Sequence, residues 1–91
     1  MYRLADTVRS THSQDGAVVL DIQQGEMFNL NPVGSRILEL LKNGSTELVV
    51  IDQISREFQV DRAVVERDVQ EFIASLHEHR ILVEAEASLR K

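Results

Sequence analysis

Residues 15–34 decide the fold of this chain, and they read DGAVVLDIQQGEMFNLNPVG. Apolar side chains alternate in residues 17–22 and again in residues 26–30. A period of two predicts β-strands with one buried face. An Asp-Gly turn signal ends at Gly16, and a second short turn contains Gly25, so the two strands are expected to be closed by tight turns. The stretch therefore predicts a β-hairpin with a further strand before it.

That further strand precedes the Asp-Gly turn, although Val8 is its only strongly apolar member. With it, the predicted sheet is a three-stranded antiparallel meander of Thr7–His12, Ala17–Ile22 and Glu26–Leu30. After the helices described next, Ile81–Val83 is expected to form a short apolar strand, the stub of a wing. The ends of the chain, about residues 1–6 and 84–91, show no partner pattern and are predicted to be mobile.

Three helices are predicted after Asn31, where the hydrophobic period becomes helical. Asn31 is a good N-cap and Pro32 suits the first helical position, where its missing N–H costs nothing. The helices should cover residues 32–42, 47–58 and 62 to about 79, the last of them capped by Asp61. Residues 48–51 could also be a strand, but the residues that follow carry no β signal. The side chains expected to face the core are Val33, Ile37, Leu40, Leu41, Leu48, Ile51, Ile54, Phe58, Val65, Val69, Phe72, Ile73 and Leu76, with Val60 and Val65 as a hydrophobic staple.

The composition places limits on both fold and function. With 91 residues the chain makes a single α+β domain, and without cysteine it has no disulfide, thiolate metal site or cysteine nucleophile. The formal net charge of −5 gives no basis for loose binding to nucleic acid. No apolar run is long enough to span a bilayer, and the N-terminus lacks the apolar stretch of a secretory signal. We therefore expect a cytoplasmic protein that binds neither membrane nor nucleic acid.

No residue pattern in the sequence indicates catalysis, a cofactor or a metal. His77 and His79 are two apart, so on a helix they point to different sides and cannot share an ion. The charged residues of the third helix are spaced for pairing along an exposed face, Arg62 with Glu66 and Arg67 with Glu71. Asp68 lies beside the core stripe and suggests a binding rim. The serines and glycines match no nucleophile or phosphate motif, so the chain is predicted not to be an enzyme.

Two helices followed by a wing stub also fit a winged-helix regulator that dimerises and binds DNA. Such a protein needs basic residues on its recognition helix, whereas residues 61–71 carry four acidic residues against Arg62 and Arg67. A DNA-binding regulator is therefore the second choice. A third alternative is a structural subunit whose role is to complete an enzyme.

The order of these features resembles the PqqD-like family. The resemblance lies in residues 15–34, with their glycine turns, an aromatic-containing strand ending in Leu30-Asn31, and a glycine near the start of the helix. It continues through residues 37–44, 54–61 and 80–82, and so covers about Val8 to Val83. The family implies a winged-helix-like domain, a three-stranded antiparallel meander followed by three helices. Its members are peptide chaperones, or recognition elements, of ribosomally made and modified peptides.

The resemblance implies two kinds of partner and no cofactor. One is the leader segment of a precursor peptide, and the other is a modifying enzyme such as a radical SAM protein or a leader peptidase of lasso-peptide synthesis; a homodimer stays open. Members that serve PQQ synthesis carry a Pro-Glu pair at the turn after the second strand, where this chain has Gln23-Gln24-Gly25-Glu26. This departure favours a peptide natural-product pathway over PQQ synthesis.

The family resemblance also implies where a leader would bind. An extended peptide can add a strand to an uncovered sheet edge through its main chain, and the resemblance puts that edge at the third strand of the meander, beside the third helix. Plain core roles for Phe28 and Phe72 are the alternative interpretation. The predicted peptide-binding residues are Met27, Phe28, Asn29, Leu30, Val64, Asp68, Glu71 and Phe72, and no catalytic or metal-binding residue is predicted. The other flank of the third helix, with Arg62, Glu66 and Ile73, is the alternative side for the groove.

Overall fold

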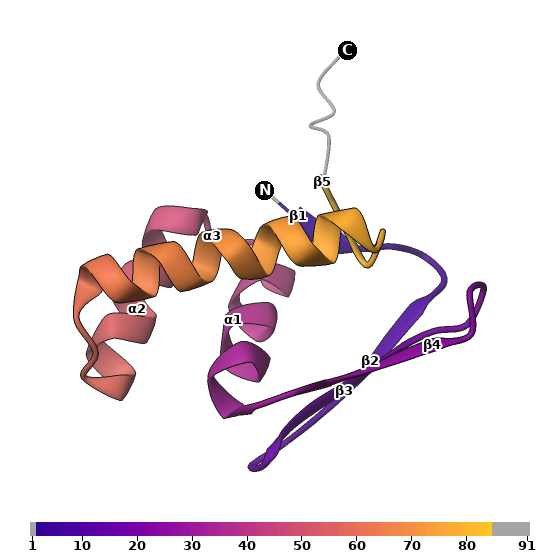
Figure 1. Ribbon diagram of the computed structural model, residues 1–91, viewed down its shortest axis with the longest axis horizontal. Helices are drawn as coiled ribbons and strands as arrows, with labels where there is room; N and C mark the ends of the chain where they lie inside the picture. Colours follow the sequence, from indigo (N-terminus) through magenta and orange to yellow (C-terminus); the bar gives the residue numbers. More distant parts are fainter. Residues whose placement is uncertain (1, 85–91) are drawn as a thin grey trace.

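Residues 2–84 fold as two small antiparallel sheets and three helices. The structure is a computed structural model that describes residues 2–84. Figure 1 shows a long hairpin sheet at one side of the helices, with α3 lying across α1 and α2. In chain order the elements are β1 (Tyr2–Leu4), β2 (Val8–Ser13), β3 (Gly16–Asp21), β4 (Glu26–Leu30), α1 (Pro32–Lys42), α2 (Glu47–Phe58), α3 (Arg62–Glu78) and β5 (Leu82–Glu84).

The three-stranded meander confirms the predicted sheet, with strand order β2-β3-β4. The observed bounds of β4 equal those predicted, and β2 and β3 are each displaced by one residue. Gly16 makes the first turn possible, because its φ of +135° is open to glycine and a Cβ there would lie 1.9 Å from the Leu30 carbonyl oxygen. The second turn is closed by Gly25 at φ +71°.

Asn31 and Asp61 cap their helices as the sequence predicts, and α2 has a cap that was not predicted. The Asn31 side chain accepts a hydrogen bond from the Gly34 amide at 2.8 Å, and Asp61 accepts one from the Ala63 amide at 3.1 Å. Thr46 caps α2 by accepting from the Val49 amide at 3.3 Å. Residues 48–51 are helical rather than extended, and α3 ends at Glu78, one residue before the predicted end.

The N-terminal segment corrects the prediction of a mobile end over residues 1–6, because Tyr2–Leu4 pairs antiparallel with Leu82–Glu84. The short apolar strand predicted at residues 81–83 is therefore half of a two-stranded sheet, displaced by one residue. The Ala5 amide extends this sheet by donating to the Ile81 carbonyl at 2.9 Å. The predicted mobile tail after Glu84 lies outside the described residues.

The core lies where α1, α2 and α3 meet each other and the inner face of the meander. It contains the predicted α3 residues Val65, Val69, Ile73 and Leu76, while Phe72 is half-buried at its border. On α2 the prediction needs correction, because Leu48 is 67% exposed and Phe58 is exposed, whereas Val50 is buried beside Ile51 and Ile54. On α1, Leu38 is buried in addition to Ile37, Leu40 and Leu41.

The sheet leaves an apolar outer face uncovered. Val19 and Ala17 point inward and are buried, whereas Val18, Leu20 and Met27 point outward and are exposed. Leu20 and Met27 are register partners on that outer face. No helix within residues 2–84 has the length and apolarity to cross a membrane.

Candidate peptide-binding site

Strand β4 is an open edge of the sheet, because its only strand neighbour within residues 2–84 is β3. The Ile22 amide bonds to the Thr7 carbonyl at 3.0 Å and continues the β2–β3 register. In an antiparallel strand the N–H and C=O groups of successive residues point to alternate edges. Because Ile22 directs its backbone groups toward β2, Val19 and Ala17, which lie three and five residues before it, direct theirs toward β4. Their register partners Phe28 and Leu30 therefore bond to β3. It follows that the N–H and C=O groups of Met27 and Asn29 face the open edge.

The side chains of β4 divide between the two faces of the sheet. Met27 is 64% exposed and Asn29 is also exposed, on the face away from the helices. Phe28 and Leu30 are half-buried and pack against the core. The Phe28 ring meets the His79 ring edge-on, with 5.2 Å between the ring centroids. Contact with the end of α3 thus positions β4 from its inner side.

A buried carboxylate holds the turn between β3 and β4 in place. Asp21 is 1% exposed, and its Oδ1 accepts from the Thr7 hydroxyl at 3.3 Å and from the Gln23 and Gln24 amides at 3.1 and 3.3 Å. Its Oδ2 accepts from the Gln24 side chain at 2.8 Å, and the same amide nitrogen donates to the His79 carbonyl at 3.4 Å. These bonds satisfy the buried charge and tie the turn to the end of α3.

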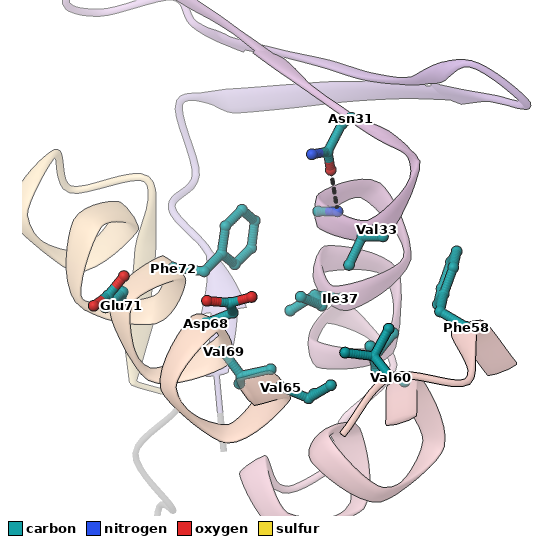
Figure 2. A pocket seen from close by; sticks show the side chains of 12 residues that line it. Asn31, Val33, Ile37, Phe58, Val60, Val65, Asp68, Val69, Glu71 and Phe72 are labelled. Carbon is teal, nitrogen blue, oxygen red and sulfur yellow. Dashed lines mark hydrogen bonds between the residues drawn. The ribbon is translucent and has the colours of Figure 1, made fainter. Parts of the chain in front are cut away.

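An apolar cavity of about 500 Å³ lies between α1, α3 and the segment that joins α2 to α3. Figure 2 shows Phe72, Val65 and Val69 of α3 on one side and Val33 and Ile37 of α1 on the other, with Val60 and Phe58 at the α1 side of the view. Asn31 lies where β4 leads into α1, so the cavity begins where the open edge ends. The residues that line it are Asn31, Val33, Gly34, Ile37, Ile54, Phe58, Val60, Val65, Asp68, Val69, Glu71 and Phe72.

Gly34 brings the three elements of the site close together. A Cβ at this position would lie 3.4 Å from Cε1 of Phe72 and 3.5 Å from Cβ of Leu30. Those distances are ordinary van der Waals contacts, so the first turn of α1 lies directly against the end of β4 and the middle of α3. The half-buried ring of Phe72 therefore borders the cavity as well as the core.

Two carboxylates, Asp68 and Glu71, are the charged groups of the described chain that line the cavity. The helix-surface pairs predicted from spacing do not form among the described residues. Arg62 instead bonds to Asp52 of α2 at 3.1 Å, and no ion pair or hydrogen bond within residues 2–84 involves the side chains of Arg67 or Glu71. Asp68 is likewise unpaired in this part of the chain.

The structure brings together only part of the predicted site. Asp68, Glu71 and Phe72 line the cavity, while Met27–Leu30 form the neighbouring edge strand. Val64 is 38% exposed on α3 and does not line the cavity. Val33, Ile37, Phe58 and Val60 line the cavity although the sequence patterns assigned them to the core or to a staple. The signal available in the sequence was the pair of apolar residues, Phe58 and Val60, at the junction of two predicted helices.

The histidines serve packing and hydrogen bonding. His12 is half-buried, and its Nδ1 lies 2.9 Å from the Ser35 hydroxyl. The Tyr2 ring meets the His77 ring edge-on at 5.5 Å. Within the described part of the chain, no three His, Asp or Glu side chains are grouped as a metal site would need.

Solved structures with similar folds cover nearly the whole chain. The structure "TbiB1 in Complex with the TbiA(beta) Leader Peptide" is 38% identical, with a TM-score of 0.83 over 92% of this chain and 98% of that one. "Lasso peptide synthetase B1 complexed with the leader peptide" is 28% identical, with a TM-score of 0.83 over 91% of this chain and 98% of that one. The solution structure of the PqqD truncation of Methylobacterium extorquens PqqCD, described as a stand-alone RiPP recognition element, is 22% identical to this chain. Its TM-score of 0.73, over 91% of this chain and 88% of that one, shows that the two share a fold.

A search of curated proteins finds no match to this chain. Residues 16–82, however, match the model of the family described as coenzyme PQQ synthesis protein D. That range runs from the start of β3 to the start of β5, and so includes the open edge, the cavity and all three helices. The chain belongs to the PqqD family.

Proposed function

We propose that this chain binds the leader segment of a ribosomally made precursor peptide and presents it to a modifying enzyme. The observation that carries the proposal is the open edge of β4, which ends at an apolar cavity beside α3. The outward N–H and C=O groups of Met27 and Asn29 provide main-chain partners for an added strand. The cavity provides a pocket for one of its apolar side chains.

The likeness to TbiB1 supports the same class of ligand for this chain. That relative was solved with a leader peptide and is 38% identical over nearly all of both chains. The second similar structure, a lasso peptide synthetase B1, was also solved with a leader peptide. The family implies that the modifying enzyme is a leader peptidase or a radical SAM protein, and the lasso relatives favour the peptidase.

The proposed role is non-catalytic. Asp68 and Glu71 are the titratable side chains of the described residues that line the cavity, and no Ser, Thr, Cys, Lys or His lines it with them. A hydroxyl, thiol or amine nucleophile must lie within hydrogen-bond reach of its base, and the described lining supplies no such nucleophile. The chain would therefore contribute binding, and the partner enzyme the chemistry.

Calorimetric titration tests the proposal directly. The titrant is a synthetic copy of the leader of the short precursor that the proposed function predicts to be encoded near this gene, and a scrambled peptide of the same composition is the control. We expect a micromolar or tighter dissociation constant for the leader and no measurable heat for the scrambled peptide. Equal binding of both peptides, or of neither, would contradict the proposed function.

A further inference from the structure

Two negatively charged side chains line the cavity, and no positively charged side chain of the described residues lines it with them. Asp68 and Glu71 are exposed and line the cavity, and no Lys, Arg or His of residues 2–84 lines it with them. In the same part of the chain neither carboxylate takes part in an ion pair or hydrogen bond. Unmatched charges of one sign at a concave, low-dielectric surface attract the opposite charge. The chain as a whole, at −5, adds to this attraction.

The two carboxylates are spaced so that one cation can contact both. They stand three residues apart on α3, and such neighbours are separated by about 5–6 Å between Cβ atoms. A guanidinium group presents donors in several directions in one plane, and it bonds to carboxylates more strongly than a neutral donor does. An arginine side chain fits this spacing best, and a lysine can satisfy one carboxylate at a time.

We propose that Asp68 and Glu71 select leader segments in which an Arg or Lys lies close to the apolar residue that enters the cavity. This inference rests on the proposed peptide-binding function and adds a charge requirement to it. In an extended segment, residues two apart lie on the same side and about 6.5–7 Å from each other. The cation is therefore expected two positions from the apolar residue, with its stem along the apolar wall and its charged end at the rim.

Selection from a random peptide library displayed on mRNA tests the inference with probes that do not depend on the sequence of the natural leader. The library is selected in parallel against the wild-type chain, the Asp68→Lys/Glu71→Lys variant and a Glu66→Lys control. Glu66 of α3 is exposed, does not line the cavity and has no partner within residues 2–84. A neutral Asp68→Asn/Glu71→Gln variant is included as well, and melting curves establish that each chain is folded.

We expect wild type and Glu66→Lys to enrich peptides with Arg or Lys at a constant spacing from an apolar residue. The reversed variant should enrich Asp or Glu at the same spacing, and the neutral variant should show no charge preference there. Enrichment of the same peptides by all four chains, or a charge that bears no constant spacing to the apolar residue, would overturn the inference while leaving peptide binding intact. Failure to enrich any peptide would instead count against the proposed function.

A charge swap in one enriched peptide measures the size of the effect. Replacing its cation with Glu should weaken binding to the wild-type chain about tenfold at low salt, and less at high salt because the rim is exposed. The same peptide should regain affinity for Asp68→Lys/Glu71→Lys. A loss that is the same for both chains would show that the cation does not meet these carboxylates.

Discussion

Arg36 of α1 binds Glu57 near the end of α2 with two parallel hydrogen bonds, Nε to Oε1 and Nη2 to Oε2, each 2.9 Å long. This pairing joins the two helices. The hydrogen bonds from Arg36 hold the pKa of Glu57 below its ordinary value, and a bond from Gln53 adds to the effect. The pairing therefore makes stability depend on pH.

The pH dependence is the first prediction. The pKa of Glu57 is lower in the folded state than its ordinary value of 4.5. The stability that its carboxylate adds is therefore fully present above that value and is lost as pH falls through the folded pKa. Glu57→Gln should reduce the free energy of unfolding at pH 7 by about 0.5–1 kcal/mol, since the pair is partly exposed. Thermal melts from neutral to acid pH should show the two chains converging, whereas a Glu66→Gln control should match wild type throughout. A deficit of Glu57→Gln that stays constant down to the lowest pH would contradict this.

The second prediction concerns the turn before β3. Gly16→Ala would place its Cβ 1.9 Å from the Leu30 carbonyl oxygen at a φ of +135°, so both a clash and backbone strain oppose it. We expect a loss of about 3 kcal/mol or more in urea unfolding. Gly25→Ala is the matched control, because its φ is +71° but nothing lies within 4 Å of the new Cβ, and it should cost about 1 kcal/mol. Similar losses for the two variants would argue against the close approach at Leu30.

The third prediction tests the open edge of β4. Asn29→Pro removes an N–H that faces outward, so leader affinity should fall about tenfold or more with only a modest loss of stability. Asn29→Ala keeps the N–H and should bind like wild type. Phe28→Pro is the structural control, because its N–H faces β3, and its main effect should be on the melting temperature. Unchanged binding by a folded Asn29→Pro would show that the leader does not pair with this edge.

The fourth prediction tests the exposed side of α3 next to the cavity. Val64 is 38% exposed and lies one turn before Asp68 on the same helix face. Val64→Asp should weaken leader binding about tenfold, because it puts a charge where an apolar side chain is expected. Ala74→Asp, an exposed change on another face of α3, should leave the dissociation constant unchanged in the same titration. If the two variants bind equally well, the leader does not contact Val64.

The fifth prediction separates this chain from a DNA-binding regulator. On α3 and its cap, Asp61, Glu66, Asp68 and Glu71 outnumber the basic residues, and Arg62 is engaged with Asp52. We expect no retardation of duplex DNA in a mobility shift at physiological salt up to tens of micromolar, roughly the range in which non-specific binders appear. Sequence-specific retardation at nanomolar protein would favour the regulator instead.

Local patterns in the sequence determined the elements and their order. The change from a period of two to a helical period at Asn31, together with the caps Asn31 and Asp61, predicted the bounds of α1 and the start of α3 as observed. The glycines at positions 16 and 25 placed both turns of the meander. These signals could be read because caps and turns depend on backbone groups only a few residues away.

Only the tertiary structure decided which faces are buried and where the cavity lies. Both faces of β3 are apolar, so contact with α1, rather than residue type, buries Val19 and leaves Leu20 exposed. The pairing of Tyr2–Leu4 with Leu82–Glu84 joins segments from opposite ends of the described chain, and a three-residue strand carries no periodic signal of its own. Phe58 and Val60 fit a core role by spacing, yet they border the cavity because α1 and α3 stay apart beside them. Distances between helices depend on every side chain packed between them, which local sequence patterns do not specify.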